Sequence, residues 1–98
     1  MLTYVIEGEM HSNHNEVLEW AKELTSHIKS LNARNPPRLM VERFGHRNKL
    51  YFVQNFDTLK ELEDFQATMA TDPKYKQLIS QRKWTHPSVK DRVLTLLD

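Results

Sequence analysis

The sequence predicts an α+β fold of the ferredoxin-like type, with the element order β-α-β-β-α-(α)-β and an antiparallel sheet whose helices lie on one face. Three observations predict it: strand-like patterns in four segments, a long helical stripe after the first of them, and two helix starts before the last. The chain has 98 residues, near the lower end of what can bury an adequate core alone. We therefore expect one domain spanning residues 1–98, stabilised by pairing with a second copy.

The first predicted strand covers residues 2–10, where apolar and polar positions alternate with a period of two. Leu2, Tyr4 and Ile6 belong to the apolar set, whereas Glu7 and Glu9 belong to the other face. Residues 11–32 then predict an amphipathic helix, because its apolar side chains recur every three or four positions. The stripe consists of Val17, Leu18, Ala21, Leu24, Ile28 and Leu31.

Residues 38–44 and 49–56 are rich in aromatic and β-branched residues and are joined by the short segment Gly-His-Arg-Asn, which is typical of a hairpin. Both strands carry apolar residues on both faces: Leu39 alternates with Met40, and Phe52 alternates with Val53. A sheet that is apolar on both sides has both sides covered. The helices can cover one face, so we expect a second copy of the chain to cover the other.

The stretch "FDTLKELEDFQATMATDPKYKQL", residues 56–78, contains two helix-start signals. Thr58 followed by Glu61 is typical of a capping box, in which each residue satisfies a free backbone N–H of the first turn. Asp72-Pro73 is a second start, because an aspartate at the N-cap and a proline at the first helical position suit a new helix. The crossover is therefore predicted to be a broken pair of helices. Residues 91–97 predict the final strand.

The composition excludes several classes of protein. Fourteen Lys and Arg balance thirteen Asp and Glu, with the signs interspersed, so we expect no nucleic-acid partner, which would need a concentrated basic face. No apolar run approaches the roughly 18 residues of a membrane span, and the N-terminus lacks the basic start of a signal peptide, which predicts a cytoplasmic protein with no membrane partner. The absence of cysteine excludes disulfides and thiolate chemistry.

The second half of the chain resembles the dimeric α+β barrel proteins, in particular the NIPSNAP-like and antibiotic-biosynthesis-monooxygenase-like branches. These families commonly show a hairpin with Gly and Asn, an aromatic strand end, an Asp-Ser/Thr-Leu helix cap and an Asp-Pro start of a second helix. The matching residues are Gly45, Asn48, Phe56, Asp57-Thr58-Leu59 and Asp72-Pro73-Lys74-Tyr75. The resemblance implies two sheets packed face to face, with a cavity between each sheet and its helices or within the barrel.

The resemblance also implies a range of activities. Family members oxygenate aromatic polyketides without a cofactor, degrade haem, isomerise lactones, interconvert sugar anomers or cyclise polyketides, and others have no known activity. Haem-degrading relatives use an Asn, Trp and His set, and the first strand here has no Asn. We therefore expect no haem and no other cofactor.

Glu7 and Glu42 are the predicted catalytic residues, because carboxylates on strands that otherwise look buried must face either solvent or a cavity. In an enclosed cavity such a carboxylate has a raised pKa and can act as a general base. Arg43, next to Glu42, is a candidate ligand-binding residue. The alternative is that the carboxylates form ion pairs at a dimer seam or lie on a solvated edge.

Tyr51, Asn55, Trp84 and His86 complete the predicted ligand-binding set. Tyr51 and Asn55 share one face of a strand, where a phenol and an amide can orient a small polar ligand; the alternative for Tyr51 is an ordinary buried tyrosine. Trp84 and His86 flank the end of the last helix. His11 and His14 have the spacing of a metal-binding pair, but a loop does not fix both rings toward one point, so we expect no metal.

Together these patterns predict a homodimer that binds a small, partly apolar organic molecule without a cofactor. Isomerase, cyclase or monooxygenase chemistry would suit such a cavity. The alternative is a dimeric binding or structural module without catalysis, in which the polar strand residues stabilise the seam.

Overall fold

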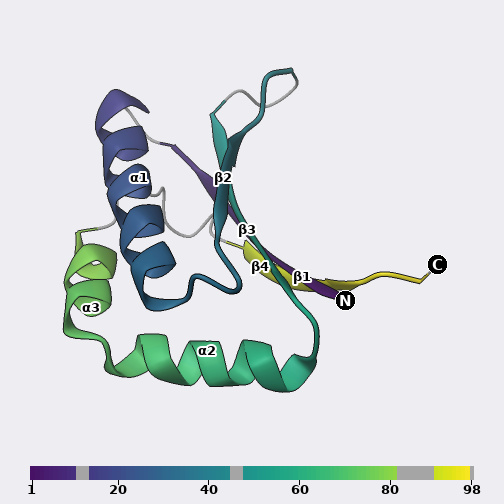
Figure 1. Ribbon diagram of the computed structural model, residues 1–98. Coiled ribbons are helices and arrows are strands. Elements are labelled where there is room, and N and C mark those ends of the chain that lie inside the picture. The colour runs from purple at the N-terminus through teal and green to yellow at the C-terminus, as the bar shows by residue number, and fades with distance from the viewer. Residues whose placement is uncertain (11–13, 45–47, 82–89, 98) are drawn as a thin grey trace.

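The structure, a computed structural model, describes residues 1–10, 14–44, 48–81 and 90–97 (Figure 1). In the described residues the order of elements is the predicted one. The strands are β1 (Leu2–Glu9), β2 (Arg38–Val41), β3 (Lys49–Phe56) and β4 (Lys90–Thr95), and the helices are α1 (His14–Leu31), α2 (Leu59–Thr71) and α3 (Pro73–Ser80).

The strands form one antiparallel sheet in the order β2-β3-β1-β4. The central pair, β1 and β3, runs in register from Leu2 opposite Phe56 to Glu9 opposite Lys49. The helices lie on one side of the sheet (Figure 1). The predicted α+β, ferredoxin-like fold is therefore confirmed.

The core lies between the sheet and the helices. Leu50, Phe52 and Phe56 of β3 point into it because alternate residues of a strand share a face. Trp20 of α1 packs edge-to-face on Phe52, and its indole N–H donates to the Leu78 carbonyl at 2.7 Å. The buried indole thus has the partner that its polar group requires, and it fixes α1 and α3 on the same part of the sheet.

The opposite side of the sheet, which we call the open face, carries the side chains of the alternate residues of each strand. The register places Val5 opposite Val53 and Thr3 opposite Leu94 there. Met40 and Leu94 are 47% and 52% exposed. The sheet is apolar on both sides, as predicted, and in Figure 1 the helices lie against one of them.

The double helix start is also confirmed. At the start of α2 the Thr58 hydroxyl accepts from the Glu61 N–H at 3.2 Å, and the Glu61 carboxylate accepts from the Asp57 N–H at 3.2 Å. Asp72 then ends α2 and begins α3, because its carboxylate accepts from the Tyr75 N–H at 2.7 Å. A single residue separates the two helices.

Asp72 has a second partner that the sequence did not predict. His27 of α1 lies 2.6 Å from the same Asp72 carboxylate oxygen, and an ionised carboxylate only accepts, so the imidazole donates. This hydrogen bond from His27, together with the one from the Tyr75 backbone, holds the pKa of Asp72 below its usual range. The corner between α2 and α3 is thereby attached to α1.

Two predicted strand ends differ from the structure. The strand predicted to run to Phe44 ends at Val41, and Phe44 is 81% exposed. The last strand begins at Lys90 and ends at Thr95, so Leu97 follows it at 96% exposure. Several predictions lie outside the described residues. They concern His11, the cap at Asn13, the turn at Gly45, Trp84 and His86.

We expect Asp72→Asn to keep the helix cap, since Asn caps as well as Asp, but to lose the ionised partner of His27. A carboxylate with a lowered folded-state pKa stabilises the fold above its unfolded pKa of about 4, and this contribution disappears as the pH falls through the lowered value. The difference in melting temperature between wild type and Asp72→Asn should therefore be present at neutral pH and shrink toward zero in acid.

Thr58→Ala is the matched control, because the threonine cap does not titrate. It should cost about 1 kcal/mol in the free energy of unfolding, with no dependence on pH from the lost cap. A melting-temperature difference for Asp72→Asn that stays constant down to strongly acidic pH would contradict the role of the charge.

Candidate functional site

A cavity of about 510 Å³ lies between the sheet and the helices, and we call it the sheet–helix cavity. Most of its wall is apolar or aromatic. It is lined by Tyr4, Ile6, Leu24, Ile28, Pro37, Phe52, Gln54, Phe65, Gln66, Met69, Ala70, Tyr75, Ile79 and Asp91. A concave, mainly apolar cavity with a few polar groups is the usual form of a small-molecule site.

The polar groups of the cavity gather around the hydroxyl of Tyr4. This hydroxyl donates to the Asp91 carboxylate at 3.2 Å. Burial, and after it the nearby charge of Asp91, raises the pKa of Tyr4 to about 12, while a hydrogen bond from Gln66 acts in the opposite direction. Tyr4 is therefore held in its protonated form and remains a hydrogen-bond donor.

Strand pairing and helix position bring these groups together. Tyr4 is on the helix-facing side of β1, opposite Val93 of β4, and Asp91 is two residues before Val93 on the same side. Gln66 comes from α2, directly after the buried Phe65. Strand β4 is an edge strand of the sheet, so the polar end of the cavity lies at this edge.

The predicted catalytic residue Glu7 lies on the open face, outside this cavity. Its carboxylate pairs with Lys49 at 3.2 Å and with Arg92 at 3.2 Å. The hydrogen bond from Lys49 holds the pKa of Glu7 below its usual range. A base needs the opposite shift to work near neutral pH, so this geometry corresponds to the ion-pair alternative.

Glu42 also lies on the open face, where its carboxylate accepts from the Tyr51 hydroxyl at 2.6 Å. That hydrogen bond, and after it burial, raises the pKa of Tyr51 to about 12. Asn55 accepts from Thr3 at 2.8 Å on the same face. Arg43 is exposed just beyond the end of β2.

The structure thus brings together Glu42 with Tyr51 but engages Glu7 with other partners. Four of the predicted residues lie on the open face: Glu7, Glu42, Tyr51 and Asn55. Neither these four nor Arg43 lines the sheet–helix cavity. Trp84 and His86 belong to the residues that the structure does not describe.

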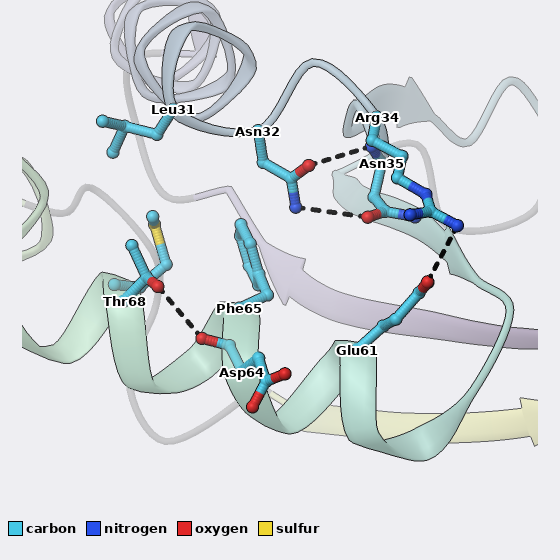
Figure 2. A pocket seen from close by; sticks show the side chains of 9 residues that line it. Leu31, Asn32, Arg34, Asn35, Glu61, Asp64, Phe65 and Thr68 are labelled. Carbon is cyan, nitrogen blue, oxygen red and sulfur yellow. Dashed lines mark hydrogen bonds and ion pairs between the residues drawn. The ribbon is translucent and has the colours of Figure 1, made fainter.

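A second hollow, of about 270 Å³, lies between α2 and the segment that follows α1 (Figure 2). Its charged groups satisfy one another: Arg34 pairs with Glu61 at 3.1 Å and with Asp57 at 3.4 Å. Asn32 and Asn35 are likewise hydrogen-bonded to each other. The hollow therefore offers few free polar groups to a ligand, and we regard it as a surface feature.

A third hollow, of about 510 Å³, runs between α1 and β2 and is lined by exposed cations, including Lys22, Lys29 and Arg38. Apart from Leu39, its lining residues are polar or charged. Among the described residues no three His, Cys, Asp or Glu side chains are grouped as metal ligands, and His14 is exposed at the start of α1. None of α1, α2 and α3 has the length and hydropathy of a membrane-spanning helix.

Sequence reasoning missed Tyr4, Gln66 and Asp91 as site residues. Tyr4 was assigned to the apolar face of its strand, which is correct, but its hydroxyl needs a partner when it is half-buried. A tyrosine on the apolar face of a strand therefore signals that a polar partner lies nearby. The partner itself, Asp91, is 87 positions further along the chain, so no local pattern could have identified it.

The raised pKa of Tyr4 gives a prediction for alkaline solution. The folded state holds the phenol proton more tightly than the unfolded state, whose tyrosine pKa is about 10, so the contribution to stability is complete below pH 10 and is lost as the pH rises toward 12. Ultraviolet absorbance titration should show two phenols, those of Tyr4 and Tyr51, with a pKa of about 12, and one of the two should disappear in Tyr4→Phe. A Tyr4→Phe titration curve identical to that of wild type would contradict this.

No protein-family model matches the sequence, and no curated protein matches it. Solved structures do match the fold. A NIPSNAP family protein from Agrobacterium tumefaciens strain C58 superposes with a TM-score of 0.82 at 15% identity, over 99% of this chain and 93% of that chain. An uncharacterised NIPSNAP domain protein from Burkholderia xenovorans gives a TM-score of 0.80 at 14% identity, over 99% and 95% of the two chains.

A variant of SnoaB, a cofactor-independent oxygenase from Streptomyces nogalater, superposes with a TM-score of 0.71 at 14% identity, over 99% of this chain and 93% of that chain. Identities this low show a shared fold and leave the chemistry open. The predicted resemblance to NIPSNAP-like and antibiotic-biosynthesis-monooxygenase-like proteins is confirmed at the level of the fold.

Proposed function

We propose that the chain forms a homodimeric α+β barrel that binds a small, partly apolar organic molecule in the sheet–helix cavity. The observation that carries this proposal is the cavity itself, with about 510 Å³ of space, mainly apolar walls and a polar end at Tyr4 and Asp91. Apolar walls provide affinity by burying a ligand's surface, and the few polar groups set its orientation.

The open face supports the dimer. It combines apolar side chains, among them Met40, Val53 and Leu94, with charged groups that already have partners, such as Glu7 with Lys49. A second copy can cover such a face without leaving that carboxylate unpaired, which would be costly. A two-fold axis would place the same residues on both sides of the contact.

Catalysis without a cofactor is the more specific form of the proposal, and it rests on Tyr4 and Asp91. Isomerase, cyclase and monooxygenase reactions of this kind remove a proton from the substrate and stabilise the resulting negative oxygen. A carboxylate can accept the proton, and a phenol that stays protonated can donate a hydrogen bond to the oxygen. A variant of a cofactor-independent oxygenase is among the solved structures that share this fold.

The alternative is a binding module without catalysis. It is supported by Glu7 and Glu42, the predicted catalytic carboxylates, whose partners on the open face suit a structural role at the dimer seam. On this alternative the cavity still binds its ligand, but the ligand leaves unchanged.

The proposed dimer can be tested by a substitution that introduces a charge on the open face. We expect sedimentation equilibrium of the wild type at micromolar concentration to give twice 11.7 kDa, and Leu94→Glu to give a monomer, because it buries a carboxylate in the contact. Leu59→Glu is the matched control, since Leu59 on α2 is 56% exposed and Leu94 is 52% exposed. A wild-type monomer, or a Leu94→Glu dimer as tight as that of the control, would rule out this interface.

The cavity is tested with Nile red, an uncharged apolar dye whose fluorescence rises when it leaves water. Ala70→Trp places a bulky indole in the cavity wall and should weaken dye binding by about tenfold or more. Ala67 and Ala70 are both exposed on α2, but Ala67 does not line the cavity, so Ala67→Trp should leave binding unchanged. Equal effects of the two variants would show that the dye binds elsewhere.

A further inference from the structure

The polar side chains that line the sheet–helix cavity are Tyr4, Gln54, Gln66, Tyr75 and Asp91. Tyr4 interacts with Asp91 and with Gln66, and these three groups are of two kinds. The Asp91 carboxylate accepts hydrogen bonds, whereas the Tyr4 hydroxyl and the Gln66 amide can donate them. The remaining wall is dominated by side chains such as Ile6, Phe52 and Ile79. A ligand must therefore place its polar group near Tyr4 and its apolar body among the others.

The charge of this polar end restricts the ligand. Asp91 is negative, and the described residues that line the cavity include no Lys, Arg or His. A carboxylate or phosphate on the ligand would lie beside Asp91, and none of the described lining residues carries a positive charge to compensate the repulsion. Asp91 is exposed to solvent, which weakens this repulsion, so the wall disfavours an anion and favours an uncharged polar group.

The donors and acceptors restrict it further. An ammonium group would satisfy Asp91 but would offer nothing to the donors on Gln66 and Tyr4, because it has no acceptor. A hydroxyl group does both, since it donates one hydrogen bond and accepts others. The wall thus complements a hydroxyl better than either kind of ion.

The Asp91 carboxylate can accept a hydrogen bond from such a hydroxyl in addition to the one from Tyr4. At 3.2 Å the Tyr4–Asp91 contact is longer than usual for a hydroxyl and a carboxylate, which typically lie about 2.5–2.7 Å apart. The same pair of groups on the open face, Tyr51 and Glu42, is separated by 2.6 Å. Tyr4 uses one of the two Asp91 oxygens, and a carboxylate can accept from several donors at once.

We propose that Tyr4 and Asp91 select an uncharged ligand that carries a hydroxyl group on an apolar body. The ligand hydroxyl donates to Asp91 and accepts either from the Gln66 amide or from Tyr4, whose single O–H then turns from Asp91 to the ligand. The apolar body lies along the cavity wall. This inference rests on the proposed binding function of the cavity and adds the chemical class of the ligand.

Three probes of similar size and shape test it: 2-naphthol, 2-methoxynaphthalene and 2-naphthoate, measured by competition with Nile red. The naphthol donates a hydrogen bond, the methyl ether cannot, and the naphthoate is an anion. We expect the naphthol to bind about tenfold or more tightly than the ether, because it makes a hydrogen bond to a charged group. The naphthoate should bind most weakly.

Substitution of Asp91 or of Tyr4 should abolish this order of affinities for the three probes. Asp91→Asn removes the charge, so the naphthol should lose its advantage over the ether, and the naphthoate should gain affinity because the repulsion is gone. Tyr4→Phe is a second variant that keeps the aromatic ring and should also reduce the preference for the naphthol. Glu42→Gln changes the corresponding carboxylate on the open face and should leave the order of the three probes as in the wild type.

The outcomes separate this inference from the proposed function. If Nile red binds in the cavity but the naphthol and the ether compete equally, or if the preference survives Asp91→Asn, the assignment of the hydroxyl class is wrong and the binding function stands. If Nile red binding does not respond to Ala70→Trp, both proposals fail. A preference for the naphthol that is lost in Asp91→Asn and kept in Glu42→Gln supports the assignment.

Discussion

The register between β1 and β3 is the constraint on which the rest of the structure depends. Alternate residues of a strand point to opposite faces, so a shift by one position would move Ile6 and Phe52 out of the core and bring Glu7 and Tyr51 into it. The same register sets both surfaces of the sheet. One becomes the wall of the sheet–helix cavity, and the other becomes the open face with its ion pairs and exposed apolar side chains.

Features that depend on neighbouring residues could be predicted from the sequence. The caps at Thr58 and Asp72 were predictable because each uses a backbone N–H three residues further along, and the strands because alternation is visible in the residues themselves. The strand end at Val41 was not, because Phe44 has the propensity for a strand, whereas the structure leaves its side chain 81% exposed beyond the strand end. The sequence analysis identified Glu7 as a carboxylate to be explained, but its partner Arg92 lies 85 positions away and only the fold brings them together.

The two faces of the sheet carry the same chemical pair in different surroundings. Tyr4 with Asp91 lies in the cavity, where burial is the first cause of the raised phenol pKa, and Tyr51 with Glu42 lies on the open face, where the hydrogen bond is the first cause. A search for phenol–carboxylate pairs alone would rank them equally. The difference lies in what surrounds each pair: the mainly apolar wall of the sheet–helix cavity in one case, and a sheet surface with ion pairs in the other. Structural similarity at 14% or 15% identity cannot make that distinction.

The joint at Asp72 has a consequence for how this fold can vary. Asp72 is the single residue between α2 and α3, and its bond to His27 holds the joint against α1. Each residue added to an α-helix turns the following chain by about 100°, so one residue inserted between Asp72 and Tyr75 would rotate Tyr75 and Ile79 out of the cavity wall. The crossover therefore has a fixed length, so the shape of the cavity can vary by replacement of the side chains that line it but not by insertion at this joint.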